Sequence, residues 1–175
     1  MQHEALDAAT QGFVDALKEA LGDAVTIDVQ NASGDSVNCG TIVNGFVSKG
    51  VDLIMANATP ALTAAVSATA DIPILGTSIT AYGVALDIDD FSGTVGGNVS
   101  GTSDLADLSK QADMITEWFP ETQKVGLLFC SGEPNSRYQI EEVAKNLSAK
   151  GIETKEFAFT DTNDVSSCLL YTSDA

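Results

Sequence analysis

Residues 124–136, KVGLLFCSGEPNS, run from an apolar strand through a short polar loop into a helix. The stretch 125–129 is almost continuously apolar, which is typical of a strand covered on both faces. Residues 131–135 favour a loop, and Ser136 is the predicted N-cap of a helix over 137–150. Such a junction leaves backbone N–H groups unpaired at the carboxyl edge of a sheet, where open α/β folds bind small ligands.

The same pattern occurs earlier in the chain, at residues 51–61, VDLIMANATPA. An apolar strand over 51–56 precedes the loop 57–60, in which Thr59 and Pro60 are the predicted N-cap and first turn of a helix. The two junctions together predict two sheet edges that face one ligand.

The rest of the chain alternates between helix and strand with short connections. Further helices are expected over 5–21, 37–49, 81–86 and 105–119, and further strands over 25–30, 72–76, 99–102 and 153–159. This order predicts an α/β fold of two Rossmann-like (flavodoxin-like) three-layer domains, with parallel sheets and helices on both faces. The first domain is expected over 1–101 and the second over 102–167. The second has two predicted strands, which are too few to cover its helices, so we expect it to be incomplete.

Composition and charge limit the classes of partner. The chain has 175 residues, of which 44% are hydrophobic and 19% charged, as in folded globular proteins. Its 25 acidic and 8 basic residues give a net charge of -17, which would repel nucleic acid and anionic lipid surfaces. No apolar run approaches the roughly 20 residues that span a bilayer. No signal peptide is recognisable after Met1.

No metal or cofactor is predicted. The chain has three cysteines, Cys39, Cys130 and Cys168, and one histidine, His3, which are too few and too scattered for a disulfide framework or a zinc site. The glycine-rich segment 93–97 is not followed by a lysine, so it does not match a phosphate-binding loop. A turn before the next strand is expected there.

Six stretches, taken in order, resemble the substrate-binding proteins of ABC importers of the tryptophan-binding type. They are QHEALDAATQGFVDAL, VQNASGD, VDLIMANATPAL, DIPILGTSIT, GGNVSGTSDL and VGLLFCSGEPNS. The similarity extends over roughly residues 2–167. The resemblance implies a type I periplasmic binding protein fold, whose two lobes close by a hinge over an amino-acid-like ligand. It also implies an extracytoplasmic protein, periplasmic or anchored as a lipoprotein, that delivers its ligand to the ABC permease subunits.

The chain departs from this family in three respects. Family members begin with a signal or lipid anchor and a first strand before His3, and they continue beyond the end of this chain, so we expect it to be truncated at both ends. Residues 168–175, CLLYTSDA, break the family pattern and are expected to be a non-native tail. Ala81 stands where the family commonly has an aspartate after Thr80.

The resemblance places the ligand at four loops. Their candidate residues are Asn57, Thr59, Ser78, Thr80, Ser131, Glu133, Asn135, Ser136 and Asp161. Thr59 and Ser136 would receive a ligand carboxylate at helix N-termini. Asn135 would bind the polar end of an amino acid, and Glu133 would pair with its ammonium. The alternative is helix capping for Thr59, Ser136 and Asn135, and a solvated loop charge for Glu133.

Other side chains and other classes of function remain open. Tyr82 and Phe91 could form an aromatic wall for a ligand or pack in the core and rim. Amino-acid racemases use a cysteine from each side of a cleft, which makes Cys39 and Cys130 a candidate pair. A ligand-sensing domain of a regulator is a third class, although no helix-turn-helix is recognisable. An aromatic ligand is suggested by the resemblance alone, and branched or other small ligands are alternatives.

Overall fold

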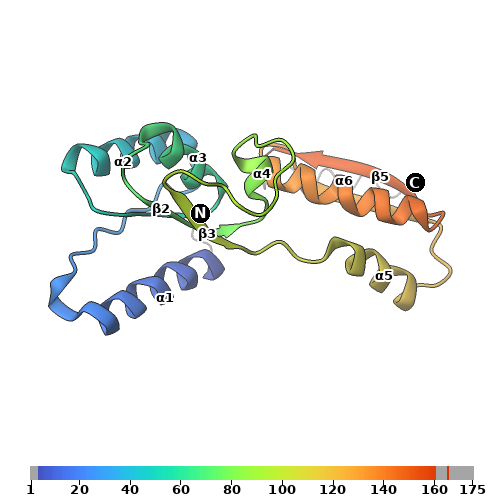
Figure 1. The fold of residues 1–175 in the computed structure, drawn as a ribbon. Helices are drawn as coiled ribbons and strands as arrows, with labels where there is room; N and C mark the ends of the chain where they lie inside the picture. The colour runs from blue at the N-terminus through green and yellow to red at the C-terminus, as the bar shows by residue number, and fades with distance from the viewer. Residues whose placement is uncertain (1–3, 161–164, 166–175) are drawn as a thin grey trace. The chain divides into compact units, whose positions relative to one another are not determined.

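The computed structural model describes residues 4–160 and residue 165 (Figure 1). The chain divides into two compact units, Met1–Leu105 and Ala106–Ala175. Each unit is described by itself. The lobe boundaries expected at residues 101 and 167 stay predictions.

The first unit is built on a three-stranded sheet. Its strands, in the order β1-β2-β3, are β1 (Ile54–Asn57), β2 (Ile74–Ile79) and β3 (Val99–Ser103). Both pairings are parallel, and Ile74 is level with Ile54 on one side and Val99 on the other. The predicted parallel arrangement is therefore confirmed here, and the carboxyl ends of all the strands lie at one edge.

Helices cover both faces of this sheet. They are α1 (Glu4–Leu21), with the 3-10 turn η1 (Gly22–Ala24), α2 (Ser36–Lys49), α3 (Thr59–Ala68) and the short α4 (Tyr82–Ala85). In Figure 1, α2 and α3 lie on one side of the sheet and α1 on the other. The ends of α2 follow from local chemistry, because the Asp35 carboxylate accepts from the N–H groups of Val37 and Asn38, and Gly50 takes the left-handed conformation.

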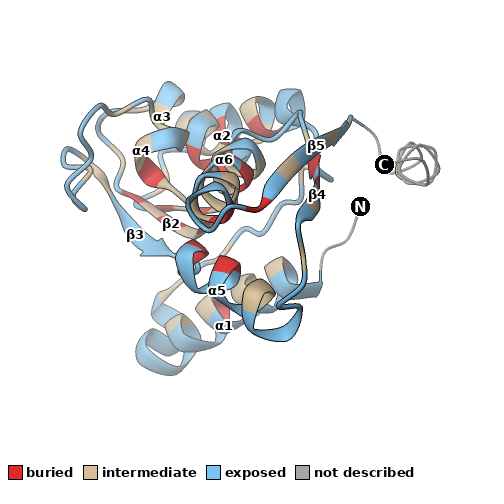
Figure 2. Ribbon diagram, turned by 90° about the vertical axis from the view of Figure 1, so that its right-hand side faces the viewer, coloured by how far each residue is buried: buried red, intermediate tan, exposed pale blue. Residues whose placement is uncertain are grey.

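The core of the first unit lies between the sheet and its helices. Buried residues alternate along β1 and the first half of β2. Figure 2 shows buried residues, in red, on β2 and on the helices over the sheet. Leu62 of α3 and Ile74 and Ile79 of β2 are fully buried. The apolar runs that predicted these strands therefore form the centre of the unit.

The strand expected over residues 25–30 is wrong. This segment has no regular structure, and among the described residues no strand pairs with it. A strand requires a hydrogen-bonded neighbour, which the alternation of the sequence cannot supply. Val29 is 60% exposed, and the segment is held to α2 through an ion pair of 2.7 Å between Asp28 Oδ2 and Lys49 Nζ.

The described part of the second unit includes two parallel strands and two helices. They are α5 (Leu108–Trp118), β4 (Lys124–Cys130), α6 (Pro134–Ala149) and β5 (Glu153–Phe159). Leu127 and Phe129 of β4 are buried with Ile140 and Leu147 of α6. Leu128, between them, points to the opposite face of the sheet and is 38% exposed.

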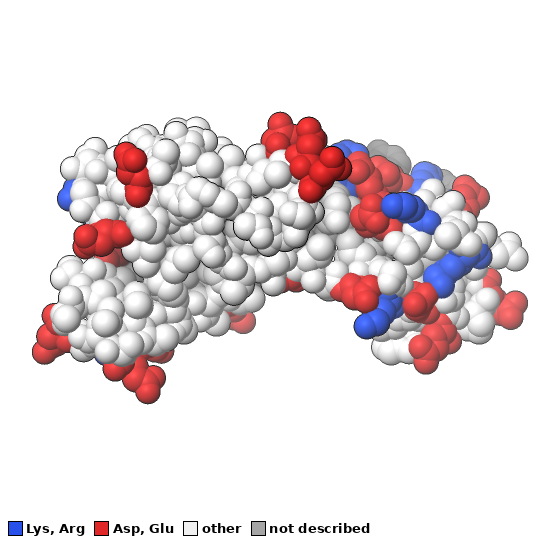
Figure 3. Space-filling view, in the orientation of Figure 1, with Lys and Arg blue, Asp and Glu red and all other residues white. Residues whose placement is uncertain are grey.

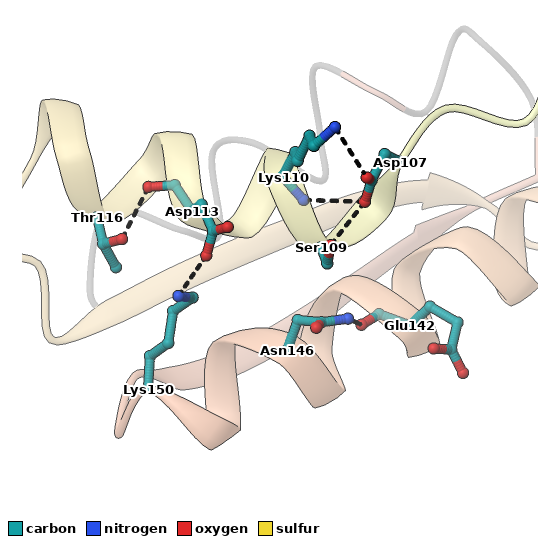
Figure 4. Close-up of polar contacts among 8 residues, drawn as sticks. All are labelled: Asp107, Ser109, Lys110, Asp113, Thr116, Glu142, Asn146 and Lys150. Atoms are coloured by element: carbon teal, nitrogen blue, oxygen red, sulfur yellow. Dashed lines mark hydrogen bonds and ion pairs between the residues drawn. The ribbon is translucent and has the colours of Figure 1, made fainter.

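Polar contacts fix α5 and its neighbour α6 (Figure 4). The Asp107 carboxylate caps α5 by accepting from the Lys110 N–H at 3.2 Å and from the Ser109 hydroxyl at 2.6 Å. These bonds, that of Ser109 first, lower the pKa of Asp107. In the middle of α5, Asp113 forms an ion pair with Lys150, just beyond α6. No helix in the described part of the chain is long and apolar enough to cross a membrane.

Candidate functional site

In the first unit, two neighbouring strands deliver the predicted residues to one sheet edge. Asn57, the last residue of β1, is level with Thr77 of β2. The next residue, Ala58, donates its N–H to the Thr77 carbonyl at 3.0 Å. The structure therefore brings Asn57 and Thr59 to the same edge as Ser78, near the end of β2, and Thr80, which follows the strand.

Asn57 is tied to α1 by its side chain. Its Nδ2 donates to the Leu6 carbonyl at 2.7 Å and to the Thr10 hydroxyl at 2.9 Å. Both amide hydrogens are thus used within the unit. Its Oδ1 is buried and is the one such side-chain atom without a partner in the described part of the chain. Asn57 can therefore offer a ligand an acceptor but no donor.

Thr59 is the first residue of α3, and its predicted role as N-cap is wrong. Ala58 is the N-cap, and no side chain caps the helix. Pro60 takes a first-turn position, where its missing N–H costs nothing. Thr59 is 7% exposed, and its hydroxyl has no hydrogen-bond partner among the described residues. A buried residue with a free hydroxyl therefore stands beside the uncapped N–H groups of a helix.

The backbone at this edge is strained at two positions. Ala58 has φ 79° and ψ 157°, a region that is essentially restricted to glycine, and Ser78 has φ 54°. The pairing of β2 with β3 shifts register between Gly76 and Ile79, just before the strand ends. Such conformations cost on the order of 1 to 3 kcal/mol each and persist where the surroundings enforce them.

The region after Thr80 contains Ala81 and the two aromatic residues, Tyr82 and Phe91, whose roles the sequence left open. Ala81 is the N-cap of α4 and offers no capping side chain, where the resembling family commonly has an aspartate. Tyr82 is 6% exposed, and burial raises the pKa of its phenol, so it belongs to the core. Phe91 is 37% exposed and lies against Gly83. Of the two aromatic residues, Tyr82 is therefore excluded as an exposed wall for a ligand.

In the second unit, the loop after β4 is held to the end of β5. The N–H and the hydroxyl of Ser131 both donate to the Phe159 carbonyl, at 2.9 and 3.2 Å. Helix α6 begins at Pro134, with Glu133 as the N-cap residue. The predicted role of Ser136 as N-cap is therefore wrong, because proline favours the first turn and the helix starts earlier than expected.

The remaining side chains of this loop are arranged around Glu133. The Ser136 hydroxyl donates to Glu133 Oε2 at 3.2 Å. Asn135 is half-buried, and among the described residues its side-chain amide has no partner. The structure thus brings Ser131, Glu133, Asn135 and Ser136 together at one loop. Asp161 lies outside the described residues, as do His3 and the tail 168–175.

Basic side chains are unevenly distributed between the units. The first unit has Lys18 and Lys49, and Lys49 is paired with Asp28. The other six are in the second unit, namely Lys110, Lys124, Arg137, Lys145, Lys150 and Lys155. Figure 3 shows few blue side chains on the visible face of the first unit, at the left, and mixed blue and red on the second. The first unit therefore offers a carboxylate at its sheet edge mainly N–H and hydroxyl donors.

The cysteines do not form a matched pair at strand ends. Cys39 lies in α2 and is 7% exposed, and burial, followed by the nearby Asp35, raises the pKa of its thiol. Cys130 is half-buried at the end of β4. The raised pKa of Cys39 leaves little thiolate at neutral pH, which does not suit a nucleophile or base. No group of side chains suited to a metal ion occurs among residues 4–160 and 165.

Sequence reasoning missed the conformation of one residue at the first edge and the role of another. Ala58 adopts its strained conformation with no signal in the sequence, because alanine is not a residue that favours positive φ. Ser103, at the end of β3, donates its hydroxyl to the Thr80 carbonyl at 2.9 Å. Ser103 and Thr80 are far apart in the chain, and their contact exists only once β2 and β3 have paired.

Comparisons with known proteins agree on one family. A family model described as ABC transporter substrate binding protein matches residues 1–173. A tyrosine-binding protein of Clostridioides difficile (strain R20291) is 33% identical over 97% of this chain and 50% of its own length. The chain thus spans about half the length of this curated relative.

Two solved structures are also similar. The ABC domain in complex with L-Trp from Streptococcus pneumonia has a TM-score of 0.89 and 32% identity, over 99% of this chain and 59% of that one. A ligand-free, open substrate-binding protein with adhesive properties from Clostridium difficile has a TM-score of 0.70 and 34% identity, over 98% and 59%.

Proposed function

Because this chain belongs to the family of ABC transporter substrate-binding proteins, we propose that it is part of the solute-binding component of an importer that captures a small amino-acid-like ligand. The expected fold class is confirmed, because the chain shares the α/β architecture with parallel sheets of type I periplasmic binding proteins. The family and the relatives are substrate-binding proteins and not enzymes. The family therefore does not support the racemase and regulator alternatives.

One observation carries the proposal, namely the uncapped start of α3 beside the free hydroxyl of Thr59. The N–H groups of a helix N-terminus and its positive dipole end favour an anion. The edge has no lysine or arginine of its own, so a carboxylate would be bound by neutral donors. An amino acid provides such a carboxylate, and the buried Oδ1 of Asn57 provides an acceptor that suits an ammonium.

The second unit would contribute the other end of the site in the complete protein. Glu133 would pair with a ligand cation, and the half-buried amide of Asn135 would donate or accept. Ser131, Ser136 and Asp161 stay candidates at the same loops. The complete protein would close by a hinge around its ligand, and the closed state would be the one that the permease recognises.

An aromatic amino acid is the proposed ligand class. It is supported by the names of the relatives, one of which is a tyrosine-binding protein and another of which was crystallised with L-Trp. The family is extracytoplasmic in general. Attachment of the complete protein through a lipid anchor, and the ABC permease subunits as its partners, belong to this proposal.

The proposal is tested by calorimetric titration of the complete protein with L-tyrosine, L-tryptophan, L-leucine and glycine, followed by chiral analysis of the ligand recovered. We expect binding of an aromatic amino acid that is recovered unchanged. Absence of heat with all four would contradict an amino-acid-binding role. Conversion of the ligand to its mirror image would restore the racemase alternative.

A further inference from the structure

The end of β3 is bonded to the predicted ligand loop that follows β2. The Ser103 hydroxyl donates to the Thr80 carbonyl at 2.9 Å and accepts from the Leu105 N–H at 3.2 Å. The neighbouring N–H of Asp104 donates to the Ile79 carbonyl at 3.1 Å. Ser103 therefore uses both its donor and its acceptor to join this loop to Leu105, the last residue of the first unit.

These bonds replace regular strand pairing at a place where the ladder is disturbed. The register of β2 against β3 shifts between Gly76 and Ile79, and Ser78 adopts φ 54°. After such a shift, the remaining contacts determine where the chain lies. The positions of Ser78 and Thr80 therefore depend on the hydrogen bonds that Ser103 and Asp104 donate to the carbonyls of Thr80 and Ile79.

Tyr82 anchors the same connection from the core. Its buried hydroxyl donates to the Thr102 carbonyl at 3.3 Å, beside Ser103. The phenol fits because two neighbouring strand positions are glycines. A Cβ added at either Gly76 or Gly101 would lie within 2.3 Å of the Tyr82 oxygen. The segment 102–105 is thus fixed against the sheet before it leaves the first unit.

We propose that Ser103 is a positioning residue that couples the loop carrying Ser78 and Thr80 to the segment by which the chain leaves the first unit. This inference rests on the proposed function. A ligand that orders the loop also orders residues 103–105 through the two bonds of the Ser103 hydroxyl. Conversely, loss of the hydroxyl leaves the loop free to move and weakens ligand capture without removing a ligand contact.

The test compares three variants of the complete protein with the wild type. Ser103→Ala removes the hydroxyl, and Ser103→Thr keeps it on a side chain that strands favour. Ser100→Ala is the matched control, because Ser100 is an exposed serine of the same strand without a hydrogen bond from its side chain among the described residues. The dissociation constants for L-tyrosine and L-tryptophan are measured by calorimetry, and the melting temperature of each ligand-free protein is recorded.

We expect Ser103→Ala to weaken binding by about three- to tenfold, the effect of one hydrogen bond. Its ligand-free melting temperature should match that of Ser100→Ala, and Ser103→Thr should bind like the wild type. A merely structural role would lower the melting temperature and leave the affinity unchanged. Unchanged affinity in Ser103→Ala, or equally weak binding by Ser103→Thr, would overturn the inference.

A second measurement separates this inference from the proposed function. Amide hydrogen exchange needs no ligand, so it can be measured even if the wild type binds none of the four amino acids, a result that would contradict the proposed function and leave this inference open to its own test. Ser103→Ala should speed exchange at Leu105 and also across residues 78–82. Faster exchange at Leu105 alone would show that the loop is not coupled to it and would reject the inference.

Discussion

The two junctions between strand and helix have similar sequences, but they differ in what their hydroxyl groups bind. After β1, Thr59 is buried and its hydroxyl lacks a partner among the described residues. After β4, the Ser136 hydroxyl already donates to Glu133, which is exposed. Both helices have proline in the first turn and no capping side chain. The same strand–loop–helix pattern therefore leaves the Thr59 hydroxyl available to a ligand, whereas the Ser136 hydroxyl is already hydrogen-bonded.

The difference indicates that the junction after β1 gains more from binding an anionic ligand group than the junction after β4. The Thr59 hydroxyl has no protein partner to give up when an anion arrives, so the new hydrogen bond replaces only contact with water. The Ser136 hydroxyl must first exchange its bond to a solvated carboxylate, so its net gain is smaller. The strained Ala58 at the first junction has no equivalent at the second, where Gly132 has ordinary φ.

The largest expected effect is at Thr59. In the complete protein, Thr59→Val should weaken binding of the amino acid by about tenfold or more, because a hydrogen bond to a charged group is lost from a buried position. Calorimetry measures the dissociation constant. Thr59→Ser should bind like the wild type, and Ser67→Ala, which removes an exposed hydroxyl further along α3, is the control. Equal affinities of Thr59→Val and Ser67→Ala would remove Thr59 from the site.

The next effect concerns the strain at Ala58. Ala58→Gly should raise the free energy of unfolding by about 1 kcal/mol, because glycine adopts this φ and ψ without the cost that alanine bears, less the added freedom of the unfolded chain. Urea unfolding of the complete protein measures the change. A decrease in stability would show that the conformation of Ala58 is not strained.

Ser136→Ala is expected to have a smaller effect on binding than Thr59→Val. The dissociation constant should rise by less than about threefold, because a hydroxyl that already has a solvated partner contributes little net free energy. The same titration measures it. A loss of affinity as large as that of Thr59→Val would contradict this difference, since the hydroxyls of both junctions would then contribute equally to ligand binding.

The smallest effect is expected at Gly132, the counterpart of the Ala58 experiment. A Cβ at this position would meet the Cys130 sulfur at 3.9 Å, which is ordinary contact. Gly132→Ala should therefore change the free energy of unfolding by no more than about 0.5 kcal/mol. Urea unfolding checks it, and a large destabilisation would mean that the second loop is as constrained as the first.

Local patterns were sufficient to predict most of the fold. The apolar run before residue 57 and the run before residue 130 mark strands because burial on both faces excludes polar residues. The helical period identified α1, α2, α5 and α6, and the polar loops identified the candidate edges. The starts of α3 and α6 were predicted one or more residues late. Pro60 and Pro134 are the better signals, because proline stands in the first turn and the cap precedes it.

Features that depend on contacts between distant segments were not predictable. The strand expected over residues 25–30 alternates correctly but has no described neighbour with which to pair. Asn57 was predicted as a ligand residue, and nothing in its sequence context shows that α1 accepts both of its amide hydrogens. The role of Ser103 arises only when β3 lies beside β2. Such facts follow from tertiary pairing, which residue spacing does not specify.

The most direct test of the account is a crystal structure of the complete protein with the aromatic amino acid that it binds. The account predicts that the ligand carboxylate lies at the start of α3, within hydrogen-bond distance of the Thr59 hydroxyl and a backbone N–H, with no lysine or arginine beside it. A carboxylate paired with a cation such as Arg137, and solvent at Thr59, would contradict it.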